Sequence, residues 1–169
     1  MGLESGWRSA LRAWETRAYA GLRSSRADRV SVAGSLPWDA ATLGGHRYCL
    51  LVSFRRDGRA VPTPVWFAPA AADRERIVIR SGASDGKVKR IRRESEVLVA
   101  PCTFRGDPVG PPMQGRARLL PEAEHAAAEA ALRDALGLQR RLYALIRDPA
   151  LEAAYIEVGE RTTIREGHR

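Results

Sequence analysis

Two strand-like runs joined by a tight turn constrain the fold of this chain more than any other feature of its sequence. Residues 48–54 are largely apolar, and residues 60–68 form a second run beyond an Asp-Gly dipeptide at residues 57–58. Asp-Gly is a strong signal for a β-hairpin, because both positions tolerate a positive φ. The second run holds Pro62 and Pro64, which have no N–H to donate to a neighbouring strand. We therefore expect an antiparallel hairpin whose second strand is irregular or lies at a sheet edge.

Further runs extend this pattern along the chain. Strands are expected at residues 76–80, 97–102 and 114–120, and residues 155–158 and 162–164 give one or two closing strands. Helices are expected at residues 85–93, 121–136 (ended by Gly137) and 138–146. A meander of strands with one short helix inserted favours an antiparallel barrel over a parallel βαβ sheet. The sequence has no GxGxxG or GxxxxGK[ST] motif, so the usual dinucleotide and nucleoside-triphosphate folds lose support.

An amphipathic helix is expected at residues 3–23, ahead of the barrel. Its apolar face consists of Trp7, Leu11, Trp14, Ala18 and Leu22, at spacings of three and four. Two interpretations stay open: this face packs on the domain or a partner subunit, or, as we favour less, the helix contacts an anionic membrane. Residues 24–45 hold Ser, Gly and Pro without a sustained period and indicate a linker. We divide the chain into a helix-and-linker segment, 1–42, and a barrel domain, 43–169.

The excess of positive charge points to an anionic ligand. The 28 Lys and Arg residues exceed the 20 Asp and Glu residues, which gives a net charge of +8. Such a protein attracts nucleic acid, an anionic membrane or a polyanionic small molecule. The sequence lacks an RNP-type aromatic motif and a convincing recognition helix. We therefore expect a small-molecule substrate and no nucleic acid.

The cysteines and histidines indicate neither a disulfide framework nor a metal site. Cys49 and Cys102 lie in separate strand-like runs without a CxxC motif, as expected of reduced core thiols. His46, His125 and His168 lie far apart and have no carboxylate or thiol at metal-ligand spacing. No apolar run is long enough to span a bilayer, and the N-terminus lacks a signal-peptide core. We expect a cytoplasmic protein without a metal.

The stretch after the strand at residues 76–80 holds the candidate site. Small and hydroxyl residues at 81–86 lead into a helix start, where unpaired N–H groups and the helix dipole attract a phosphate. Lys87 and Arg90 share one face of this helix, and we assign both to the phosphate. Asp85 is expected to cap the helix with its carboxylate. The remaining cations, Lys89, Arg92 and Arg93, are expected to be solvated or to lie near an extended anionic tail.

Five segments, taken together, carry a resemblance to a known family. They are Leu51–Gly58, Val61–Ala68, Ser84–Arg93, Val97–Cys102 and Gly115–Leu120. With these residues in this order, the chain resembles the split β-barrel flavin and deazaflavin oxidoreductases related to pyridoxamine 5'-phosphate oxidase. It looks most like the actinobacterial subgroup that depends on coenzyme F420. The resemblance covers roughly residues 43–146.

The resemblance implies a mainly β, α+β fold: a six-stranded antiparallel split β-barrel of the FMN-binding kind, here with an N-terminal helical extension. It also implies a homodimer with two cofactor sites at the subunit interface. By the same resemblance, the cofactor phosphate lies near Ser81, Ser84, Lys87 and Arg90. The cofactor ring rests near Thr63, Pro64 and Val65, and Arg55 reaches the same cleft.

These features lead to an expected function. We expect an oxidoreductase that binds coenzyme F420 and transfers a hydride between it and a small organic substrate. An FMN-dependent oxidoreductase with the same phosphate seat is one alternative. A non-catalytic protein that carries a cofactor or a tetrapyrrole-sized ligand is another, since fold alone does not fix function. No nucleophile–base pair stands out, and we name no catalytic residue, as suits a reaction whose chemistry the cofactor supplies.

Overall fold

The computed structural model describes residues 27, 30, 32–146 and 152–160. Its elements are, in chain order, η2 (Ala40–Leu43), β1 (Tyr48–Phe54), β2 (Ala60–Trp66), β3 (Ala68–Pro69), β4 (Ile77–Gly82), α2 (Gly86–Arg93), β5 (Glu96–Cys102), β6 (Met113–Leu119), α3 (Glu122–Ile146) and β7 (Ala153–Gly159). The helix expected at residues 3–23 and the strand expected at 162–164 lie outside the described residues. Within those described, no helix combines the length and apolar character needed to cross a membrane.

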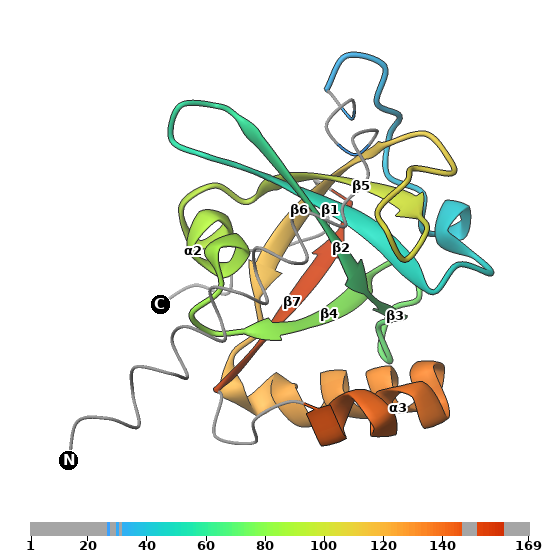
Figure 1. Cartoon of the computed structure of the whole chain (residues 1–169). Coiled ribbons are helices and arrows are strands. Elements are labelled where there is room, and N and C mark those ends of the chain that lie inside the picture. Colours follow the sequence, from blue (N-terminus) through green and yellow to red (C-terminus); the bar gives the residue numbers. More distant parts are fainter. Residues whose placement is uncertain (1–26, 28–29, 31, 147–151, 161–169) are drawn as a thin grey trace.

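One antiparallel sheet curls upon itself to form the body of the molecule (Figure 1). Its strand order is β2-β1-β5-β6-β7-β4-β3, so β2 and β3 are its two edges. These edge strands are separated in the chain by Phe67 alone. Because consecutive Cα atoms are only about 3.8 Å apart, the two edges must meet there. The expected α+β class and antiparallel curl are confirmed.

The number of strands differs from the expected six. In the described part of the chain the sheet has seven strands, because the run expected at residues 60–68 is divided at Phe67 into β2 and β3. β2 pairs with β1, whereas β3 pairs with β4. A single sequence run therefore supplies both edges of the sheet. The alternation of side chains along the run gives no sign of this change of partner.

Both prolines of the expected hairpin lie in the edge strand β2. Pro62 is opposite Val52 and Pro64 is opposite Leu50 in the pairing with β1. Residues two apart in a strand direct their N–H groups to the same side. Because an edge strand lacks a neighbour on one side, β2 is a position where residues without an N–H donor are tolerated. Of the two expected alternatives, an irregular strand or an edge strand, the structure shows an edge strand.

The interior of the curled sheet is a single apolar core. Alternate residues of β1, Cys49 and Leu51, point into it and are fully buried. Val88 and Ile91 of α2 and Leu43 of η2 pack onto the same core. The other buried members are Val65, Phe67, Ile77, Ile79, Val97, Val99, Met113, Ala117, Ile156 and Val158. The short helix α2 is thus anchored by two side chains, and its basic residues lie outside the core.

Helix α3 lies along the outer face of the sheet, below β3, β4 and β7 in Figure 1. Ala128 and Leu132 pack there against Val78 and Tyr155. The break expected at Gly137 is wrong, because α3 continues through it to Ile146. A glycine in a helix interior costs only about 1 kcal/mol relative to alanine. Tertiary packing of a helix face outweighs a cost of this size.

Residues ahead of β1 contribute to the packed domain. Leu36 forms a parallel bridge with Met113, and Trp38 packs against the main core. A Cβ atom on Gly115 would lie 2.9 Å from Cε3 of Trp38, so only glycine leaves room for the indole. Residues 36–43 of the expected linker are therefore held against the sheet.

Candidate functional site

The start of α2 forms a small cationic cradle. The Nε of Arg90 donates to the hydroxyl of Ser53 on β1 at 2.9 Å, which leaves both terminal nitrogens for another acceptor. A Cβ atom built on Gly86 would lie 2.9 Å from Nη1 of Arg90. The guanidinium therefore lies directly over the first residue of the helix. The missing side chain of Gly86 makes this approach possible.

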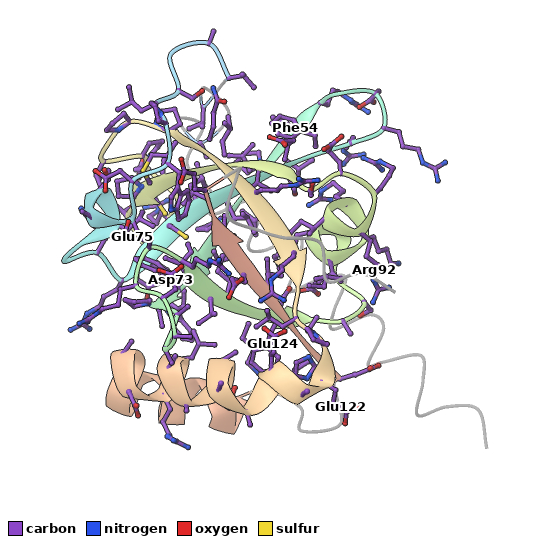
Figure 2. The ribbon with its side chains drawn as sticks, turned by 180° about the vertical axis from the view of Figure 1, so that it is seen from behind. Phe54, Asp73, Glu75, Arg92, Glu122 and Glu124 are labelled. Carbon is purple, nitrogen blue, oxygen red and sulfur yellow. The ribbon has the colours of Figure 1, made fainter. Side chains whose placement is uncertain are left out.

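Two further arginines lie near this guanidinium. Arg93 donates from Nη2 to the carbonyl oxygen of Phe54 at 2.7 Å, and Figure 2 shows Phe54 at the α2 end of the sheet. Burial, with the neighbouring charges of Arg55 and Arg93, lowers the pKa of Arg90. Among the described residues, no carboxylate forms an ion pair with any of these three arginines. The cluster therefore has uncompensated positive charge, which an anion would neutralise.

The first turn of α2 adds backbone donors to the cradle. Asp85 occupies the N-cap position, but its carboxylate accepts no capping hydrogen bond from the backbone N–H groups of the helix. The prediction that its carboxylate caps the helix is therefore wrong. Its Oδ2 instead accepts from the backbone N–H of Gly82 at 3.0 Å and from the Ser81 hydroxyl at 2.7 Å. The first-turn N–H groups keep the positive end of the helix dipole beside Arg90.

Lys87 is held within the turn. Its Nζ donates to Oδ2 of Asp85 at 2.8 Å and to the hydroxyl of Ser81 at 2.9 Å. Its side chain is only 14% exposed. Burial alone would raise the pKa of Asp85, but the charge of Lys87 and the hydrogen bonds at this turn outweigh it and lower that pKa from 3.8. Lys87 thus has a structural partner, whereas Arg90 has none among the described carboxylates.

We expect Asp85→Asn to destabilise the fold by up to about 1 kcal/mol at neutral pH, because the pair with Lys87 is partly exposed. Since the folded-state pKa of Asp85 lies below 3.8, this contribution is present above pH 3.8 and is lost as the pH falls through the folded-state pKa. The difference in unfolding free energy between the two proteins should therefore shrink on acidification. Urea unfolding at pH 7, 5 and 3 measures it. A difference that is constant across this range would contradict the role assigned to the carboxylate.

The residues of β2 expected near a ring do not share one face. Thr63 is opposite Leu51 and Val65 is opposite Cys49, so both point to the inner side of the sheet. Pro64 points to the outer side, where a Cβ on Gly106 would contact its ring at 3.3 Å. Of the three, Thr63 lies nearer to the end of β1 that carries Ser53.

The expected site residues are therefore only partly brought together. Arg55 and Arg90 lie in one cluster, and Ser81 lies with Lys87 in the neighbouring turn. Ser84 is exposed in that turn. Sequence reasoning missed Ser53, a buried hydroxyl at the end of an apolar run, where its polar character was the available signal.

The two cysteines are buried, and the metal-ligand residue types form no cluster of three or more in the part of the chain that the structure describes. Burial raises the pKa of Cys49 well above 9.0 and that of Cys102 to about 12, so neither is a thiolate at neutral pH. Both are buried and unpaired, as expected of reduced core thiols. Among the described residues, no three His, Cys, Asp or Glu side chains are grouped as metal ligands would be.

Two solved structures have folds similar to that of this chain. A FAD-binding protein from Mesorhizobium loti has a TM-score of 0.51 and 15% identity, over 71% of this chain and 83% of that one. A protein of unknown function from Agrobacterium tumefaciens has a TM-score of 0.51 and 12% identity, over 68% of this chain and 48% of that one. The chain thus shares its fold with a FAD-binding protein. It spans just under half of the Agrobacterium protein.

A third solved structure has a slightly lower TM-score. A pyridoxamine 5'-phosphate oxidase-related, FMN-binding protein from Nostoc punctiforme has a TM-score of 0.49 and 14% identity, over 72% of this chain and 74% of that one. No family model matches the sequence, and no curated protein matches it. At these identities the comparisons establish the fold alone.

Proposed function

We propose that this protein is an oxidoreductase that binds a phosphate-bearing, flavin-type cofactor. The observation that carries the proposal is the cradle of Arg90 and Gly86 at the uncapped start of α2. It offers a guanidinium and backbone N–H groups to one anion, and none of the described carboxylates forms an ion pair with that guanidinium. Guanidinium and helix N-terminus are both suited to a phosphate. The fold shared with a FAD-binding protein supports the same class of ligand.

Within this class we propose coenzyme F420, with FMN as the alternative. Both carry a phosphate, but F420 also has a carboxylate-bearing tail. Lys89 and Arg92 are exposed on α2, and Figure 2 shows Arg92 pointing outward from that helix. We propose that the tail extends from the cradle along the helix and meets these cations. The net charge of +8 favours the more anionic ligand.

The residues of this chain would position the cofactor and shield it. Ser53 holds Arg90 in place through its hydroxyl, and the first turn of α2 supplies donors to the phosphate. Thr63, on the inner side of β2, lies towards the same end of the sheet. When bound, the cofactor supplies hydride transfer to a small organic acceptor. We propose that a second copy of the chain completes the cleft in a homodimer, which light scattering of the purified protein tests.

Isothermal titration calorimetry of the purified protein with F420, FMN and riboflavin tests this proposal. Riboflavin is the matched control, because it has the ring system of FMN and no phosphate. We expect saturable binding of F420 and FMN, tighter for F420, and at least tenfold weaker binding of riboflavin. Tighter binding of FMN would replace F420 by the alternative. Equal affinity for FMN and riboflavin, or binding of none of the three, would contradict the phosphate seat.

A further inference from the structure

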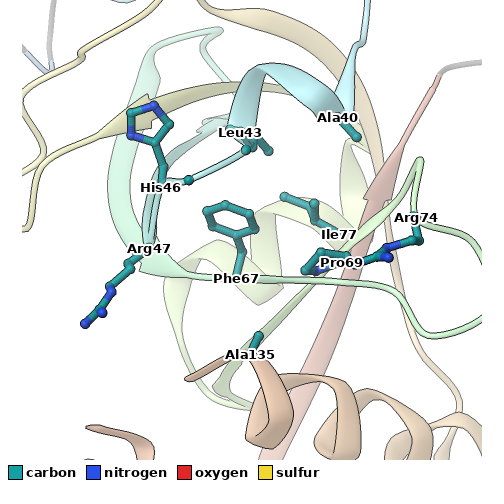
Figure 3. Close-up of a pocket in the computed structure, with 11 residues that line it drawn as sticks. Ala40, Leu43, His46, Arg47, Phe67, Pro69, Arg74, Ile77 and Ala135 are labelled. Carbon is teal, nitrogen blue, oxygen red and sulfur yellow. The ribbon is translucent and has the colours of Figure 1, made fainter. Parts of the chain in front are cut away.

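A pocket of about 190 Å³ opens at the end of the sheet opposite to α2. It lies where η2, the start of β1, the β2–β3 junction and α3 meet (Figure 3). β1 begins beside this pocket and ends beside the cradle, and its seven residues span about 20 Å. The pocket is therefore separate from the proposed cofactor seat, and it is not needed to explain that function.

The floor of the pocket is apolar. Leu43, Phe67 and Ile77 line it and belong to the main core, and Ala40 and Ala135 form parts of its walls. A dry cavity of about 150 Å³ lined by similar side chains accommodates benzene. A pocket of about 190 Å³ therefore has room for one six-membered ring with a small substituent. Expulsion of water from this floor would favour an apolar body.

The rim of the pocket is cationic. Arg74 and His46 both line it, and Figure 3 shows the Arg74 side chain running alongside Pro69, while His46 lies above Phe67. Arg47 extends away from Phe67 in the same view. Among the described residues, no carboxylate forms an ion pair with Arg74. An apolar floor with an uncompensated cation at its mouth matches an amphiphilic anion.

We propose that this pocket binds a small aromatic carboxylate. The ring lies against Phe67 and Leu43, between the walls that carry Ala40 and Ala135. The carboxylate lies at the rim, where the guanidinium of Arg74 donates to it. The ligand needs both the ring and the carboxylate. A carboxylate alone would form only an exposed ion pair, which contributes little to binding. A ring alone would leave the guanidinium of Arg74 without an anionic partner.

Calorimetric titration of the full chain with benzoate, benzyl alcohol and acetate tests the proposal. Benzyl alcohol has the ring without the charge, and acetate has the charge without the ring. We expect saturable binding of benzoate, weaker binding of benzyl alcohol and no saturable binding of acetate. Arg74→Gln should weaken benzoate binding about fivefold and leave benzyl alcohol unchanged. The same change at Arg56, exposed in the β1–β2 hairpin, should affect neither.

Substitutions that fill the pocket test whether benzoate binds there or elsewhere on the protein. Ala135→Phe, on the exposed side of α3, should reduce benzoate affinity at least tenfold and leave FMN binding unchanged. Ala40→Leu, from the opposite wall, should do the same and serves if the first variant does not fold. The absence of saturable benzoate binding would overturn the proposal. Benzoate affinity unchanged in a folded filling variant, or lowered equally by the Arg56 change, would overturn it as well.

Discussion

Replacing Arg90 with glutamine should weaken binding of F420 and FMN by about 10- to 150-fold, since a hydrogen bond to a charged group contributes about 1.5–3 kcal/mol. Arg90 is the cation that the fold directs over Gly86 at the start of α2. Its Nε is fixed by Ser53, and its terminal nitrogens have no carboxylate partner among the described residues. The dissociation constant, measured by calorimetry, is the quantity to compare.

Three variants define the specificity of this effect. Arg92→Gln is the matched control, because Arg92 carries the same charge on the same helix but points outward (Figure 2). It should change FMN affinity no more than about threefold, the scale of an exposed charge. Ser53→Ala should have an intermediate effect, since it removes the partner of Nε without removing the charge. Gly86→Ala should weaken binding because its methyl group displaces Nη1 of Arg90. Equal losses of FMN affinity from Arg90→Gln and Arg92→Gln would show that net charge, rather than the cradle, controls FMN binding.

Replacing Leu51 with alanine should lower the free energy of unfolding by about 2–5 kcal/mol. Leu51 lies in the middle of β1, is fully buried and points into the core enclosed by the curled sheet. The strands around it are paired on both sides of β1, so the backbone has little freedom to collapse into the cavity. The loss combines the transfer free energy of the removed atoms with the cost of that cavity.

Urea unfolding followed by tryptophan fluorescence measures this change. Leu36→Ala is the matched control, because the same atoms are removed from a side chain that is 48% exposed. Leu36 forms backbone hydrogen bonds with Pro112 and Gln114, which the substitution keeps. We expect the control to lower the free energy of unfolding by less than about 1 kcal/mol. Similar losses for the two variants would contradict the enclosed core described for β1.

The elements with strong local signals were predicted from the sequence. Apolar runs and the Asp-Gly turn predicted β1 and β2, and the two prolines predicted that β2 is irregular or lies at an edge. The start of α2 was predicted within one residue from the small and hydroxyl residues that follow β4. In each case the signal is contained in a few neighbouring residues, so no distant contact is needed to interpret it.

Local signals failed where a distant or competing partner decides the outcome. Asp85 has the residue type and position of a helix cap, but Ser81, Gly82 and Lys87 compete for its carboxylate. Gly137 is a weak helix former, yet α3 continues through it. A propensity of about 1 kcal/mol is small beside the packing of a whole helix face.

For the candidate site as well, the sequence predicted some features and only the tertiary structure decided others. The sequence alone determined that the turn after β4 is rich in hydroxyl and basic residues, because composition and strand-to-helix periodicity are local properties. Only the tertiary structure decided which of these cations has an internal carboxylate partner. It pairs Lys87 with Asp85 inside the turn and brings Ser53 to Arg90 from 37 residues away. A sequence gives the number of positive charges. An anion site requires a cation that has no carboxylate partner within the protein. Only folding determines which cations have such partners.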